Sequence, residues 1–177
     1  MNSNEIDAEI PEEIKPVLLE LGTALNTCQT FEYSLCFLLS LLSEHRKPSQ
    51  GKAFQASWDF HSRKMLGKLV DALKKQVKMP DDYEEYLRKG ISARNDIVHK
   101  FMNKPENGMR MINPVGRLQL VKELRNLREE VRARDQSLQP ITDALLKKYG
   151  LSTESLKRSA ENAWRWNNFE TSRKSTH

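Results

Sequence analysis

Apolar side chains recur every three or four residues near the start of the chain. The set is Leu18, Leu21, Leu25, Cys28, Leu35, Leu39 and Leu42. This spacing predicts a long α-helix with one apolar stripe, because an α-helix has about 3.6 residues per turn. Pro11 followed by two acids favours a helix start there, with Pro16 as the alternative start, and the segment 47–51 ends the helix with a proline and a glycine.

The rest of the sequence predicts further helices and no convincing strand. We expect helices over 52–78, from Asp81 or Asp82 to about Met102, from about Arg117, over 141–149 and from Ser152 or Thr153 to about Trp166. Pro140 should kink or end the fourth helix, because proline lacks a backbone N–H and clashes with the preceding turn. Asn103–Gly116, with two prolines and two glycines, should be irregular. The pattern predicts an all-α, up-and-down bundle of about five helices.

Length and composition limit the organisation of the molecule. A chain of 177 residues suits one domain, and we expect a flexible N-terminus over 1–10, a helical domain over 11–168 and a flexible tail over 169–177. Cys28 and Cys36 lie about 12 Å apart along one predicted helix, too far for a disulfide; buried free thiols suit a reducing compartment, which predicts a cytoplasmic protein. No apolar run is long enough for a membrane span. The net charge of +5 permits a polyanionic partner without requiring one.

Two charged residues occupy positions where the helical periodicity predicts apolar ones. Glu32 lies between Cys28 and Leu35 on the first stripe. Arg94 lies within a second stripe formed by Leu87, Ile91, Val98 and Met102. Because a buried charge is costly unless it is paired, we expect Glu32 and Arg94 to face one another across the bundle, or to line a cleft together. An ordinary ion pair that fixes the helix register explains the same pattern.

Arg94 has two further polar neighbours on its helix. Asn95 and His99 are four residues apart and share a face. Arginine, asparagine and histidine together can bind a phosphate and move a proton near neutral pH. Basic residues that could follow a phosphate backbone are Lys100, Lys104, Arg63 and Lys64. A metal site is not expected, since no two histidines are three or four residues apart and none lies near a cysteine.

Residues 94–99, Arg-Asn-Asp-Ile-Val-His, resemble the motif of the HEPN superfamily: arginine, a polar residue, three more residues, then histidine. The leucine-rich first helix with Glu32 and the helix containing residues 63–69 are similar as well, so that the resemblance covers about residues 15–105. It implies a HEPN-like bundle that acts as a metal-independent endoribonuclease, without a cofactor, in a toxin–antitoxin, defence or stress system. Two copies of the chain would meet at their motif helices and form one composite cleft.

The same resemblance implies roles for single residues. His99 would act as general base or acid, Arg94 would hold the scissile phosphate, Asn95 would orient the phosphate or the histidine, and Glu32 would position Arg94. Family toxins that are silenced by adenylylation carry a tyrosine two residues after the histidine, where this chain has Phe101. That difference puts this form of control in doubt, although a neutralising protein of another kind remains compatible with the sequence.

Other interpretations of the sequence remain open. A non-catalytic helical module that binds RNA or a protein partner is the main alternative, and a helical DNA-binding regulator is weaker because no compact helix-turn-helix pattern is visible. Trp164 and Trp166 could stack on unpaired bases, or could dock the last helix on the bundle.

Overall fold

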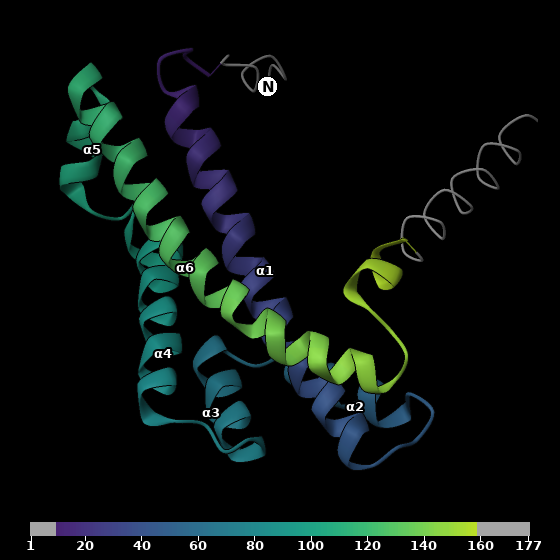
Figure 1. Ribbon diagram of the computed structural model, residues 1–177. Helices are drawn as coiled ribbons and strands as arrows, with labels where there is room; N and C mark the ends of the chain where they lie inside the picture. The colour runs from purple at the N-terminus through teal and green to yellow at the C-terminus, as the bar shows by residue number, and fades with distance from the viewer. Residues whose placement is uncertain (1–9, 159–177) are drawn as a thin grey trace, which may run out of the picture.

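The computed structural model describes residues 10–158, and within this range the chain is helical without any strand (Figure 1). The helices are α1 (Lys15–Arg46), α2 (Lys52–His61), α3 (Leu66–Gln76), α4 (Asp81–Asn95), the π-helical turn η1 (Asp96–Lys100), α5 (Pro105–Met111) and α6 (Pro114–Lys148). Residues 153–158 are helical as well. The all-α prediction is therefore confirmed, while the described residues form more helices than the expected five or so.

The two longest helices, α1 and α6, cross in the centre of the molecule and run in the same direction (Figure 1). Side-chain contacts between the two helices agree with this parallel direction. Arg128 near the middle of α6 pairs with Glu20 in the first half of α1, and Lys148 at the end of α6 lies 3.4 Å from His45 at the end of α1. The other helices pack around this parallel pair.

One continuous cluster of apolar side chains joins α1, α3, α4, η1 and α6. In α1 the core position between Cys28 and Leu35 is filled by Phe31, and Glu32 lies beside it at the edge of the core with 31% of its side chain exposed. In the motif segment, Ile97 and Phe101 are buried, whereas Val98 and Met102 are exposed. The expected stripe is therefore wrong by one position at both places, and the charged residues lie at the core boundary.

The second predicted helix is interrupted in the structure. The expected helix 52–78 is broken at residues 62–65, where Met65 is extended with ψ 144°. His61 and Leu66 are both buried on either side of this break. No proline or glycine occurs in the four residues between them to end the helix. The break instead coincides with the burial of both side chains.

Residues 103–116, expected to be irregular, contain α5 and the first turn of α6. Pro105 and Pro114 each occupy the first helical position, where a missing N–H costs nothing. Asn113 caps α6 by accepting a 2.7 Å hydrogen bond from the Gly116 N–H. A side chain at Gly116 would be impossible in this geometry, since its Cβ would lie 2.3 Å from the Arg110 carbonyl oxygen.

Pro140 does not end α6, which continues to Lys148, so that 141–149 is not a separate helix. The carbonyl of Gln136, which would accept from an N–H at position 140, belongs to an exposed residue and can bond to water. Gly150 then ends the helix with a φ of 68°, as predicted from its position. Ser152 begins the helical segment that follows, because its hydroxyl accepts from the Ser155 N–H at 3.0 Å.

Candidate functional site

Arg94 and Glu32, 62 residues apart in sequence, form an ion pair between α4 and α1. Arg94 Nε donates to Glu32 Oε1 at 2.7 Å, and Nη2 lies 2.7 Å from the same oxygen. The side chain of Arg94 is 20% exposed and that of Glu32 is 31% exposed. The ion pair is therefore only partly desolvated, and both groups remain reachable from solvent.

The free edge of the Arg94 guanidinium contacts the other two motif residues. Nη1 donates to Asn95 Oδ1 at 3.2 Å and lies 2.8 Å from His99 Nε2. Because arginine carries only donors, a hydrogen bond between these two atoms requires the tautomer in which His99 Nε2 is the acceptor. Nε2 of an exposed histidine thus lies directly beside the Arg94 cation.

The π-helical turn explains how residues five apart in sequence meet. On an α-helix, Arg94 and His99 would point about 140° apart around the axis. In η1 the backbone bonds run from residue i to i+5, as in the 2.7 Å bond from the Phe101 N–H to the Asp96 carbonyl. Each residue of such a turn rotates the chain by less than the 100° of an α-helix, which brings His99 closer to the side of the helix that carries Arg94. Such turns are frequent at functional sites.

Side chains after the motif hold the end of η1. Asn103 Nδ2 donates to the His99 carbonyl at 2.7 Å, and the buried Asn107 Nδ2 donates to the Phe101 carbonyl at 2.7 Å. Phe101 itself is 2% exposed. The position two residues after His99 is therefore a core position in this chain.

The Glu32–Arg94 ion pair lies in a cleft of about 910 Å³, formed by α1, α3, α4, η1 and the turn at 62–65. The cleft contains six basic residues, Arg63, Lys64, Lys68, Arg88, Arg94 and Lys100. Its acidic residues are Glu32 and Asp71, and Asp71 already pairs with Arg88 at 2.7 Å. The lining of the cleft thus carries an excess of positive charge, which favours an anionic ligand.

The structure brings together most of the residues selected from the sequence. Glu32, Arg63, Lys64, Arg94, Asn95, His99 and Lys100 all line the cleft. Lys104 does not line it and is exposed at the start of α5. Arg63 and Lys64 reach the cleft because they stand in the α2–α3 turn, and Lys100 pairs with Asp96 one turn away at 2.9 Å.

Sequence reasoning missed two cations of the cleft, Lys68 and Arg88. Each lies on the polar face of an amphipathic helix and has an acidic neighbour, which is typical of ordinary surface residues. Only the position of α3 against α4 reveals that they face the same hollow as Arg94.

The two cysteines are buried and free, as expected for packing residues. Burial raises the pKa of both Cys28 and Cys36 to about 11, so that neither thiol is activated as a nucleophile.

The part of the chain that the structure describes contains no cluster of three or more metal-ligating side chains. None of its helices is long and apolar enough to span a bilayer. Trp164 and Trp166 lie outside the described residues.

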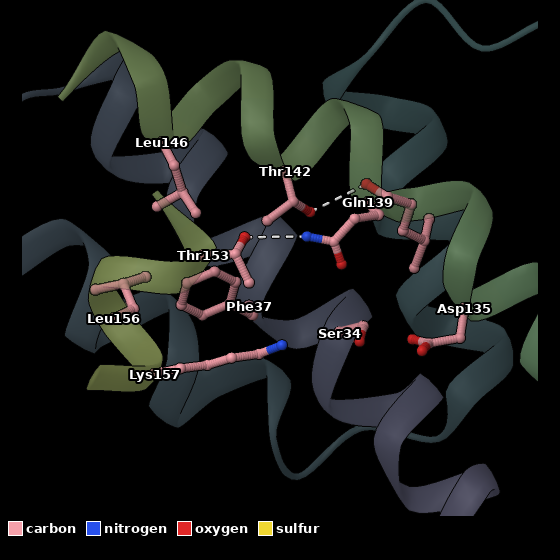
Figure 2. A pocket seen from close by; sticks show the side chains of 10 residues that line it. Ser34, Phe37, Asp135, Gln139, Thr142, Leu146, Thr153, Leu156 and Lys157 are labelled. Atoms are coloured by element: carbon pink, nitrogen blue, oxygen red, sulfur yellow. Dashed lines mark hydrogen bonds between the residues drawn. The ribbon is translucent and has the colours of Figure 1, made fainter. Parts of the chain in front are cut away.

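A second hollow of about 320 Å³ lies between α1, α6 and residues 153–158, and Phe37 and Lys157 are among the side chains that line it (Figure 2). Thr153 holds residues 153–158 against α6, because its hydroxyl donates to Asp143 at 2.6 Å and accepts from Gln139 at 3.0 Å. The bond from Thr153, together with a 3.0 Å bond that Gln139 Nε2 donates to the same carboxylate, holds the pKa of Asp143 below its usual range. With neither a histidine nor an arginine in its lining, this hollow is a weaker candidate than the cleft.

No protein-family model, no curated protein and no solved structure matches this chain.

Proposed function

We propose that this chain is a metal-independent endoribonuclease of the HEPN type, acting in a toxin–antitoxin, defence or stress system. The observation that carries the proposal is the arrangement of Glu32, Arg94 and His99: a cation positioned by a carboxylate, with His99 Nε2 2.8 Å away from that cation. The arrangement opens into a cleft rich in basic side chains. Arg94 and His99 belong to the six-residue motif that resembles HEPN proteins, and Glu32 lies outside it.

These groups suffice for cleavage of RNA by its own 2′-hydroxyl. When Arg94 Nη1 donates to a bound phosphate in place of His99, Nε2 is free to accept the proton of the 2′-hydroxyl, and the 2′-oxygen attacks the adjacent phosphorus. The P–O5′ bond then breaks, and the leaving 5′-oxygen takes a proton from an acid, for which the second His99 of a dimer is suited. Arg94 stabilises the additional negative charge of the transition state. The products are a 2′,3′-cyclic phosphate and a 5′-hydroxyl.

The dimer is part of this proposal. Val98 and Met102 flank His99 on the same turn of the chain, and both are substantially exposed, at 37% and 49%. Apolar side chains beside an exposed histidine favour contact with another copy of the same surface. Charged substitutions such as Val98→Asp and Met102→Asp should therefore abolish the dimer in light scattering and reduce cleavage together, with Arg94 and His99 still present.

Cleavage of single-stranded RNA in the presence of EDTA tests the catalytic proposal. Wild type should produce cyclic-phosphate ends, whereas His99→Ala should abolish cleavage and retain the helical circular dichroism of wild type, because His99 is exposed. Lys104→Ala, which changes a cation outside the cleft, is the matched control and should cleave like wild type. Varied RNAs left intact by dimeric wild type would contradict the proposal.

A non-catalytic module that binds RNA or a protein partner is the second candidate. It is favoured by the fact that Arg94 is already engaged by three side chains of its own protomer. In that case Arg94→Ala would destabilise the fold, and His99→Ala would leave every measured property unchanged.

A further inference from the structure

An aromatic groove of about 630 Å³ adjoins the cleft. We use this name for the hollow lined by Thr30, Tyr33, Ser34 and Phe37 of α1 together with Trp58 and Ser62 of the α2 region. Its most exposed large side chain is Tyr33, with 60% of its surface open to solvent. The lining carries no charged residue, so that its chemistry is that of aromatic faces and hydroxyl groups.

The Tyr33 ring is supported from one side. It stacks on Trp58 with ring centroids 6.2 Å apart and an angle of 28° between the planes. Trp58 in turn stacks on Phe54 at 6.4 Å, and Phe54 meets Phe37 edge to face at 5.6 Å. A ring that is packed on one face and exposed elsewhere offers a flat surface at little further entropic cost, which is how proteins hold unpaired nucleobases.

The aromatic groove and the cleft are neighbours that share one lining residue. Ser62 lines both hollows, and Tyr33 directly follows Glu32 on α1. A ligand that occupied both would meet aromatic faces in one part and positive charge in the other. Single-stranded nucleic acid has this composition, whereas an apolar peptide segment would match the groove and gain nothing from the basic residues beside it.

We propose that the aromatic groove binds an unpaired base of single-stranded RNA, stacked on Tyr33, next to the phosphate held at Arg94. The position of that phosphate rests on the proposed function, whereas stacking itself requires no cleavage. The site selects for single strands, because the faces of a base inside a duplex are covered by its neighbours. Tyr33 is thus a binding residue that determines which RNA conformation enters the cleft.

Binding measured in a cleavage-silent background tests this proposal. The parent is the full chain with His99→Ala, and the probe is a fluorescein-labelled single-stranded RNA of mixed sequence, compared with its duplex by fluorescence anisotropy. Adding Tyr33→Ala should weaken single-strand binding about tenfold, from the loss of one stacked base. Tyr33→Phe retains the ring and should bind like the parent. Tyr149→Ala removes a partly exposed tyrosine elsewhere and should have no effect.

Two further measurements identify stacking as the cause. A 2-aminopurine base in the RNA should lose fluorescence on binding to the parent and keep it with Tyr33→Ala. The slope of log Kd against log salt concentration should be the same for both proteins, because no phosphate contact is lost, whereas Lys64→Ala should reduce that slope. Circular dichroism checks the fold of each variant.

The proposal is overturned if Tyr33→Ala binds single-stranded RNA as tightly as the parent, if Tyr33→Phe is as weak as Tyr33→Ala, or if duplex binding falls equally. Absence of any RNA binding by the parent overturns it too. If wild type cleaves RNA and Tyr33→Ala changes neither affinity nor 2-aminopurine fluorescence, only this inference fails. If single strands bind through Tyr33 and wild type leaves them intact, the endoribonuclease proposal fails and this inference stands.

Discussion

The ion pair between Glu32 and Arg94 should contribute measurably to stability, and a double-mutant cycle can isolate that contribution. Fully exposed pairs contribute about 0.2–1 kcal/mol, and a hydrogen bond to a charged group contributes about 1.5–3 kcal/mol. With side chains 20% and 31% exposed and two nitrogens 2.7 Å from one oxygen, this pair lies between those cases. We therefore expect a coupling energy of about 1.5 kcal/mol between Glu32→Gln and Arg94→Gln.

Urea unfolding followed by far-UV circular dichroism provides the four free energies of unfolding that the cycle needs. The coupling should decrease when salt is added, because solvent and ions reach both side chains. A coupling below about 0.3 kcal/mol would be indistinguishable from additivity and would refute the argument from partial burial. A value that does not change with salt would show that the pair is more enclosed than its exposure indicates.

Cleavage kinetics of Glu32→Gln separate a positioning role from a structural one. Loss of the carboxylate adds positive charge to the cleft, so that RNA affinity should stay constant or increase. The cleavage rate at saturating RNA should nevertheless fall, because Arg94 is no longer held beside His99. A variant that is merely less stable would instead recover its full rate at lower temperature.

Three further predictions concern stability. Gly116→Ala should lower the urea midpoint by the equivalent of about 1–3 kcal/mol, since its Cβ would overlap the Arg110 carbonyl; an unchanged midpoint would contradict the packing described for α5 and α6. Hydrogen bonds from the Gly51 and Ser49 backbone lower the pKa of Glu44 to about 2, so wild type should lose stability as the pH falls from 4.5 towards 2, and Glu44→Gln should show a flatter thermal-midpoint profile across that range. Burial, with a smaller effect of Lys64, lowers the pKa of His61, so the unfolded state binds the proton more readily than the folded state. The free energy of unfolding should therefore decline as the pH falls below 6.5. Urea unfolding of His61→Gln should lack this decline.

The elements that sequence reasoning predicted well are those set by local chemistry. The long helix α1 follows from its apolar spacing and from the proline and glycine after it, and Gly150 ends α6 as its backbone freedom predicts. The helix class of nearly every segment could be predicted in this way, because amphipathic periodicity persists over many residues.

The errors arose where tertiary contacts decided the backbone. Residues 62–65 leave the helix although their propensities permit one, and residues 105–111 form a helix although they contain proline and glycine. The second case has visible supports: Arg110 makes a two-pronged ion pair with Glu123 of α6, and the buried Asn107 bonds to the end of η1. Contacts of this kind between distant segments have no local signal in the sequence.

The candidate site contains one contact that the sequence predicts and one that depends on tertiary structure. That Glu32 and Arg94 are paired followed from the cost of an unpaired charge near the core, which the sequence alone exposes. His99 was selected because it shares a helix face with Asn95, but its 2.8 Å contact with Arg94 did not follow from α-helical geometry, which directs the two side chains about 140° apart. The π-helical turn η1 reduces that angle, and no proline or glycine in residues 94–100 marks it. A departure from regular helix geometry persists where surrounding contacts stabilise it, and here those contacts are the Arg94–His99 hydrogen bond and the two asparagines that hold the end of the turn. The least predictable feature of the backbone is thus the one that assembles the proposed catalytic groups.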